Sequence, residues 1–288
     1  MEDILNSSED NSGSKYTICF IGNITPREFQ NEHEKRQGYT YFGVFDNIYG
    51  LIKNSDLTIA NLEAPVVDKP ESIKKNFKIY SSPSQLIPIL KYSGVDAISL
   101  ANNHSYDHGV YGLQRTRQVL MMNRIEQFGA MDKQSIVRGK FQIFGFTTHI
   151  NQGWSGYVSR YRRNIENITF MEDKFPIAYV HWGQASEVDP RGDQRYIAAD
   201  LLRLGFKLIV GHGPHRAQKP WSIFNGIPII YSLGDFYSST DSLINEGYIL
   251  LATFSGQVLT NLERYKIRIK VAKSGATRLA KISREDLV

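Results

Sequence analysis

Three apolar segments of this chain each end on a histidine. They cover residues 98–104, 177–181 and 208–212, and a further histidine, His215, follows the last of them. An apolar run bounded by Gly and polar residues indicates a buried strand, and ligands gather at the tips of such strands in open α/β sheets. Imidazole is the commonest protein metal ligand and a good acid-base group near neutral pH. The pattern predicts a convergent metal site, although each histidine could instead have a structural role.

Oxygen donors lie at other predicted strand ends. Glu63 ends the run 56–63, and Asn103 stands beside His104. A two-metal hydrolytic site needs a bridging carboxylate and neutral nitrogen and oxygen donors around ions about 3.5–4 Å apart. In the sequence Gly-His-Gly-Pro-His at 211–215, the glycines allow a sharp turn and Pro214 restricts it, so that His212 and His215 can face one centre. The residue types therefore indicate metal-assisted hydrolytic or acid-base chemistry.

The elements that would position these groups alternate along the chain. We expect helices over 41–53, 82–92, 112–123 and 194–204, and strands over 16–22, 56–63, 96–101, 141–148, 176–182 and 206–210. This alternation predicts parallel βαβ units. After residue 221, Asn225-Gly226 predicts a hairpin, and 248–254 and 265–271 resemble antiparallel strands. We expect an α/β fold with mixed sheets, one domain over 15–288 and a disordered lead over 1–14.

Composition limits the partners. The net charge is +5, and Lys and Arg are scattered, which argues against nucleic acid and suits an anionic substrate. Cys19, the single cysteine, lies in an apolar run and is expected in the core. The polar start lacks the features of a signal peptide, and we see no membrane anchor. We therefore expect a cytoplasmic protein, and leave open whether it forms a homo-oligomer.

Five motifs occur in an order that resembles a known family. They are Asn61-Leu-Glu63-Ala-Pro65, Ala101-Asn-Asn-His104-Ser-Tyr-Asp107-His-Gly109, His181-Trp-Gly183, Gly211-His-Gly-Pro-His215 and Tyr231-Ser-Leu-Gly-Asp235-Phe236. Together they closely resemble the bacterial capsule-synthesis protein CapA family, or poly-γ-glutamate biosynthesis family, over about 16–238. That family is similar to calcineurin-like metallophosphoesterases. The resemblance implies a four-layer α/β/β/α sandwich of the metallophosphoesterase type around a two-metal centre.

The resemblance also assigns roles to residues. It implies one or two divalent ions (manganese, zinc, iron or calcium), with metal-site candidates Glu63, Asn103, His181, His212, His215 and, with less charge to offer, Asn23. His104 corresponds to a histidine that acts on the substrate as an acid or charge stabiliser, and His181 is a second proton-handling candidate. Asp107 would orient His104, or alternatively cap the turn before His108-Gly109.

Three positions depart from the family pattern. The family's first strand normally ends in Gly-Asp, whereas this chain has Gly22-Asn23, and Gly213 stands where the family usually has a second histidine. The last motif usually ends in Gly-Asn-Phe, but Asp235 takes the place of the Asn. Losing a carboxylate and an imidazole weakens a two-ion site. Asp235 would restore some charge if it faced the pocket.

Two residues in or directly after the motifs are substrate-binding candidates. Arg216 could recognise a carboxylate or phosphate, and Trp182 could stack on a substrate, with core packing as the alternative for Trp182.

The leading hypothesis is a CapA-like metal-dependent enzyme acting on a peptide or a polyglutamate or capsule-type polymer precursor, by hydrolysis, transfer or epimerisation. The alternatives are a two-metal phosphoester hydrolase and a non-catalytic binding protein with a degraded site.

Overall fold

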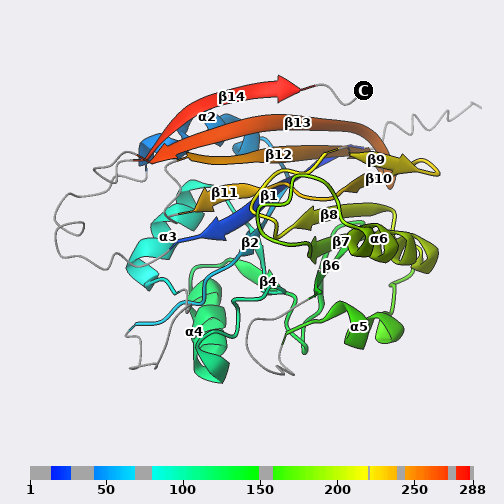
Figure 1. The fold of residues 1–288 in the computed structure, drawn as a ribbon, viewed down its shortest axis with the longest axis horizontal. Coiled ribbons are helices and arrows are strands. Elements are labelled where there is room, and N and C mark those ends of the chain that lie inside the picture. The colour runs from blue at the N-terminus through cyan, green and yellow to red at the C-terminus, as the bar shows by residue number, and fades with distance from the viewer. Residues whose placement is uncertain are drawn as a thin grey trace, which may run out of the picture.

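The fold was obtained as a computed structural model, and the structure describes residues 14–26, 42–68, 80–148, 158–219, 221–238, 244–271 and 277–285. Residues 1–13 of the expected disordered lead lie outside these ranges. Two β-sheets form the centre of the molecule, and helices lie on the outer side of each sheet (Figure 1).

The first sheet combines a parallel half with an antiparallel half. Its described strands are, in order, β14 (Thr277–Glu285), β13 (Val258–Val271), β12 (Ile244–Ser255), β1 (Lys15–Thr25), β2 (Leu57–Leu62), β3 (Ala97–Ser99) and β4 (Glu126–Phe128), and β11 (Asp235–Ser238) also pairs with β1. Strands β1 to β4 run parallel, and β12 to β14 are antiparallel. The sheet is therefore mixed, as expected.

The second sheet is parallel at its centre and antiparallel at its edges. The order of its described strands is β5 (Ser135–Arg138), β6 (Phe141–Thr147), β7 (Phe175–His181), β8 (Leu208–His212), β10 (Ile227–Ile230) and β9 (Ser222–Phe224). The edge strand β9 pairs with β10 in the hairpin that Asn225-Gly226 predicted. The parallel strands β7 and β8 end side by side, because His181 and His212 are Cα partners.

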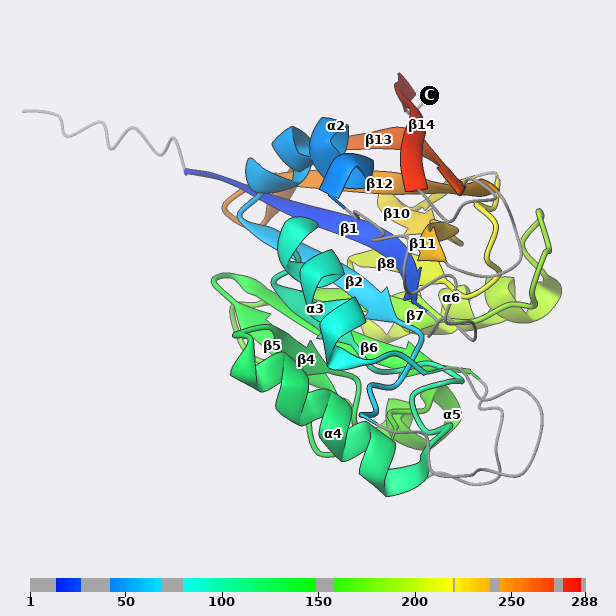
Figure 2. The ribbon, with the colours of Figure 1, turned by 90° about the vertical axis from the view of Figure 1, so that its left-hand side faces the viewer.

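Helices cover the outer face of each sheet. The first sheet is covered by α2 (Phe42–Lys53), α3 (Pro83–Tyr92) and α4 (Gly109–Met122), which lie in a row in Figure 2. The second is covered by α5 (Tyr161–Asn164), the short 3-10 helix η1 (Ile165–Asn167) and α6 (Gly192–Leu204). As expected, α6 ends at Gly205, whose φ of 108° suits glycine. The described helices are all too short or too polar to cross a membrane.

Alternation along the strands builds three apolar cores. On β1, Cys19 and Ile21 pack towards the helices, whereas Phe20 packs between the sheets. On β7, Tyr179 packs between the sheets and Val180 packs towards α6. Strands buried on both faces need continuous apolar sequence, which is why these runs are unbroken. The three cores separate four layers, so the expected α/β/β/α sandwich is confirmed.

The structure corrects some element boundaries. Strand β1 continues through Thr25, so Asn23 lies within a strand and not in the polar loop that its sequence suggested. The extension exists because the end of β1 pairs with β2 on one side and β11 on the other. Helix α4 begins at Gly109, three residues before its expected start. The short strands β4, β5 and β11 and the charged strand β14 were not predicted.

Replacing Tyr179 by Phe should weaken the contact between the two sheets. The Tyr179 hydroxyl donates a buried hydrogen bond of 2.5 Å to the Ile21 carbonyl oxygen on the other sheet. Removing this bond should lower the free energy of unfolding by about 1–2 kcal/mol, measured by urea denaturation. Tyr196→Phe, at a side chain 65% exposed, is the control and should change little. Equal stability of the two variants would contradict the prediction.

Candidate active site

The candidate site lies where strands of both sheets end. Glu63 directly follows β2 of the first sheet, whereas His181 and His212 are the last residues of β7 and β8 in the second. His215 lies in the loop that follows β8. A parallel strand delivers its carboxyl-terminal side chain to one edge of the sheet, so the sandwich brings the ends of both sheets together.

A carboxylate and three imidazoles meet at this edge. Glu63 Oε1 lies 3.2 Å from His181 Nε2 and 3.7 Å from His215 Nε2. The His212 ring lies beside the His181 ring, with their centroids 5.2 Å apart. Glu63, His181 and His212 are buried, but the His215 side chain is 33% exposed. The structure thus brings together four of the residues predicted from the strand ends, and His215 opens the group to solvent.

A chain of buried asparagine amides connects the strands beneath this group. Asn102 Nδ2 donates to Asn61 Oδ1 at 3.0 Å, and Asn61 Nδ2 donates to Asn23 Oδ1 at 3.0 Å. Asn23 Nδ2 donates to Asp235 Oδ1 at 3.1 Å. We call Asn102, Asn61 and Asn23 the asparagine ladder. Asn23 is the Cα partner of both Asn61 and Asp235, so the register of three neighbouring strands dictates these contacts.

The sequence predicts the asparagine ladder only in part. Asn61 and Asn102 belong to the sequence motifs, but the motifs do not indicate that they bond to each other. The feature that could have pointed to them is that both are amides beside predicted strand ends. Asn102 also fixes the next loop, since its Oδ1 accepts from the backbone N–H groups of His104 and Ser105 and from the Ser105 hydroxyl.

Asp235 supplies a second carboxylate. Its Oδ1 lies 2.9 Å from His215 Nδ1, and only 6% of the residue is exposed. The charge that Asn23 lacks is therefore present on the neighbouring strand, one hydrogen bond away. Because Asn23 already uses its Oδ1 with Asn61 and its Nδ2 with Asp235, Asp235 is the better-placed oxygen donor of the two.

His104 is held by Asp107. His104 Nδ1 lies 2.7 Å from Asp107 Oδ2, and the carboxylate is almost fully buried while the imidazole is 12% exposed. The contact fits the expected orientation of the His104 ring by Asp107. At the start of α4, the side chain of the N-cap residue His108 makes no capping hydrogen bond.

Burial and neighbouring charge shift three pKa values at the site. Burial raises the pKa of Glu63, but the imidazoles of His215 and His181 outweigh it and lower the value to about 2. Burial, together with the nearby His181, lowers the pKa of His212 well below its ordinary value. Burial raises the pKa of Asp235 despite its hydrogen bond with His215. Glu63 is thus ionised and His212 neutral near pH 7, which are the forms that bind metals.

The donor set fits a divalent ion, although the donors contact one another in this structure. Among the described residues, no three His, Cys, Asp or Glu side chains stand in a ready-made metal-binding arrangement. Within the same ranges, however, Glu63 Oε2 and both ring nitrogens of His212 are buried without a hydrogen-bond partner. Leaving such atoms unsatisfied costs about 1–3 kcal/mol each. A carboxylate with neutral imidazoles is a suitable ligand set for zinc and similar ions.

The remaining residues predicted for the site differ from one another in burial. Asn103 is half-buried in the loop between Asn102 and His104, and Arg216 is exposed directly after His215. The prediction that Trp182 contacts substrate is wrong, because its side chain is fully buried and Nε1 donates to the Tyr231 carbonyl oxygen at 2.6 Å. An indole with a satisfied N–H is a core residue here.

Gly213 is required by the tight turn between the histidines. Its φ is 121°, and a Cβ added there would lie 2.5 Å from the Trp182 carbonyl oxygen and 3.3 Å from His181 Nε2. A second histidine at this position has no space in the present backbone.

The two sheets and their outer helices form a sandwich of the metallophosphoesterase type. A crystal structure described as a novel phosphatase from Mycoplasma pneumoniae matches with a TM-score of 0.55 and 12% identity, over 89% of this chain and 94% of that one. This likeness concerns the fold. The chain belongs to the family described as bacterial capsule synthesis protein PGA_cap, whose model matches residues 17–240. The resemblance seen in the motifs is confirmed.

Two curated relatives agree with this assignment. The PGA biosynthesis protein CapA of Bacillus subtilis is 24% identical over 245 residues, which cover 76% of this chain and 62% of that protein. The capsule biosynthesis protein CapA of Bacillus anthracis is 26% identical over 247 residues, which cover 77% of this chain and 59% of that protein. The match therefore spans less than two thirds of either relative.

The ionised Glu63 should make stability depend on acid pH. Its pKa in the folded protein, about 2, lies below its ordinary value of 4.5, so its contribution to stability is present above pH 4.5 and is lost as the pH falls towards 2. Unfolding of chelator-treated protein, followed at several pH values in urea, should show a smaller loss over this range in Glu63→Gln. Glu172→Gln, at an exposed site, is the control. A Glu63→Gln curve parallel to that of the original protein would contradict the assignment.

Exchanging the residues at 23 and 235 should move the second carboxylate without removing it. Asp235→Asn alone should weaken Mn²⁺ binding about tenfold or more, measured by calorimetric titration. The double variant Asn23→Asp with Asp235→Asn should recover most of that loss, because the two side chains are hydrogen-bonded partners. Unaltered Mn²⁺ affinity in Asp235→Asn would show that its carboxylate does not serve the ion.

Proposed function

We propose that this protein is a metal-dependent enzyme acting on an anionic peptide or polyglutamate-type capsule precursor by metal-assisted acid-base chemistry. Membership of the capsule synthesis family supports the substrate class, as do the names of the two Bacillus relatives. The observation that supports catalysis best is the His104–Asp107 pair, a partly exposed imidazole bonded to a buried carboxylate. The cytoplasmic location and the oligomeric state stay predictions.

Glu63, His181, His212 and His215 are the residues proposed to hold the ion, with Asp235 supporting His215. When bound there, a divalent ion would polarise a carbonyl or phosphoryl oxygen of the substrate.

His104 is the proposed proton-handling residue. Because Nδ1 contacts the Asp107 carboxylate, proton exchange with a substrate would take place at Nε2. The carboxylate fixes the ring orientation, and an imidazole held in this way can act as a general acid or as a group that stabilises a developing anion. His181 is less suited to this role, since it is buried against Glu63.

The residues of the candidate site suit a single ion better than the two ions that a phosphoester hydrolase would need. Glu63 and Asp235 are the two buried carboxylates that contact His215, and Gly213 occupies the position of the family's further histidine. Two equivalents of metal per chain with turnover of an aryl phosphodiester would favour the hydrolase instead. Absence of metal together with full function in His104→Ala would favour the non-catalytic alternative.

His104→Ala should separate metal binding from turnover. With an oligomer of γ-linked glutamate as the probe, the variant should lose about 10²–10⁴-fold in turnover, followed by chromatography and by NMR for loss of chirality. Its Mn²⁺ content should match that of the original protein, since His104 is not among the proposed ligands. His181→Ala and His212→Ala should instead lose the ion while keeping the fold.

Arg203→Gln, on the exposed face of α6, is the control and should keep both properties. Unchanged turnover in His104→Ala would remove the catalytic role of the His104–Asp107 pair. Full metal occupancy in both the His181 and His212 variants would show that the ligands are misassigned.

A further inference from the structure

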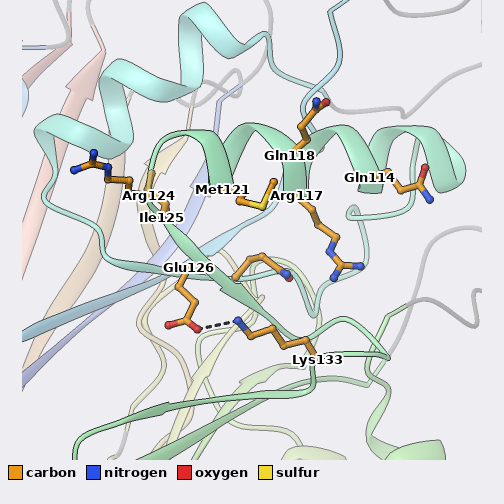
Figure 3. Close-up of a pocket in the computed structure, with 9 residues that line it drawn as sticks. Gln114, Arg117, Gln118, Met121, Arg124, Ile125, Glu126 and Lys133 are labelled. Carbon is orange, nitrogen blue, oxygen red and sulfur yellow. Dashed lines mark hydrogen bonds and ion pairs between the residues drawn. The ribbon is translucent and has the colours of Figure 1, made fainter.

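Two surface pockets differ in how their charges are satisfied. The larger, of about 630 Å³, lies along α4 and includes Arg117, Glu126 and Lys133 (Figure 3). Two of its three cations already have carboxylate partners, because Lys133 pairs with Glu126 and Arg117 pairs with Asp132, each at 2.8 Å. Arg124 is the third cation of the lining. Most of the positive charge of this pocket is therefore already engaged.

The smaller pocket, of about 300 Å³, lies beside the candidate active site. Its walls come from residues 188–189, from the loop between β8 and β9, and from β12 and β13. The charged residues in its lining are Arg216, Lys219, Lys266, Asp189 and Glu246. We call it the Arg216 pocket.

Two backbone segments of the Arg216 pocket continue into the candidate active site. Arg216 directly follows His215, whose ring contacts both Glu63 and Asp235. On the other side, Gly247 of the pocket pairs with Gly234, the residue before Asp235. The backbones are so close that a Cβ at Gly247 would lie 2.3 Å from the Asp235 carbonyl oxygen. The pocket lining at Arg216 and Gly247 therefore adjoins, along the backbone, the two residues His215 and Asp235 of the candidate site.

The pocket carries an excess of positive charge. Glu246 is engaged by Arg268, whose Nε lies 2.5 Å from Glu246 Oε1. Across the described ranges, Arg216 and Lys266 have no ion-pair partner, and Asp189 is the other carboxylate in the lining. Cations without partners in a concave site attract anions, and guanidinium binds carboxylates in a bidentate manner.

The lining suits a carboxylate better than a phosphate. A phosphate dianion needs several converging cations, but here Asp189 and Glu246 lie among the basic residues. A lining that mixes cations with carboxylates suits a peptide-like chain, which presents single negative charges between amide N–H groups. A volume of about 300 Å³ lies at the lower end of the range for ligand pockets, so it would hold a short stretch of such a chain.

We propose that the Arg216 pocket is a subsite that binds a carboxylate-bearing stretch of the substrate while the reacting part lies at His104 and His215. This inference rests on the proposed function and adds the residues that select an anionic chain. Arg216 and Lys266 are its main contacts. They bind and orient the substrate and take no part in proton transfer.

Binding of an uncharged analogue tests the subsite directly. The probe is a short oligomer of γ-linked glutamate, compared with the same oligomer carrying side-chain amides, and binding is measured by calorimetry with Mn²⁺ present and after chelation. Arg216→Gln with Lys266→Gln should weaken binding of the acidic oligomer about tenfold or more, and should hardly change binding of the amide oligomer. Mn²⁺ content should be unaffected.

Two further variants serve as controls. Arg117→Gln with Arg124→Gln removes the same number of charges from the pocket along α4 and should leave binding of the acidic oligomer within about twofold of the original protein. Arg216→Lys keeps the positive charge but loses the planar guanidinium that binds a carboxylate in a bidentate manner, so it should retain part of the affinity.

Equal weakening by the two double variants would overturn the subsite, because it would show a general effect of net charge. Displacement of the oligomer by inorganic phosphate at equal affinity would overturn the carboxylate assignment. If His104→Ala keeps its turnover while the Arg216 variants lose binding, the proposed chemistry fails and the subsite survives. If His104→Ala loses its turnover while the Arg216 variants keep their binding, the subsite is overturned and the proposed chemistry survives.

Discussion

Glu63 is a carboxylate held almost entirely out of water, and its charge must be compensated by its neighbours because an isolated buried charge is strongly destabilising. The compensation comes from the other sheet, through His181 and His215. Neither sheet alone could provide both the acid and its partners. The site therefore depends on the packing of one sheet on the other, to which the hydrogen bond from Tyr179 to Ile21 contributes.

The asparagine ladder gives the site its rigidity. Neighbouring strands lie about 4.8 Å apart, a spacing that a pair of amide side chains can bridge. Each rung uses one donor and one acceptor, so an amide in the ladder fixes the rotamer of the next. The ladder connects the His104 loop, through Asn102, to Asp235 and His215 at its other end. The groups of the candidate site are thus connected by one network of neutral side chains.

The sequence predicted the layers well because continuous apolar runs and capping residues are local signals, as at β7 and α6. It also identified Glu63 and the histidines, since each stands at the end of such a run. It did not predict which residues touch, because the contact between Glu63 and His181 spans 118 positions of the chain. Asn23 was misplaced in a loop because the strand that lengthens β1, β11, is too short to be recognised. The inward direction of Asp235 likewise depends on that pairing.

Gly213 limits how this site could have changed during evolution. A side chain there would collide with the Trp182 carbonyl oxygen, and Trp182 is itself fixed by its bond to Tyr231 and by the close approach of Gly211. A Cβ at Gly211 would lie 2.3 Å from the indole nitrogen. Placing an imidazole there would thus require several coordinated substitutions, each unfavourable by itself. Change in this pocket is therefore expected at other positions before it is expected at this turn.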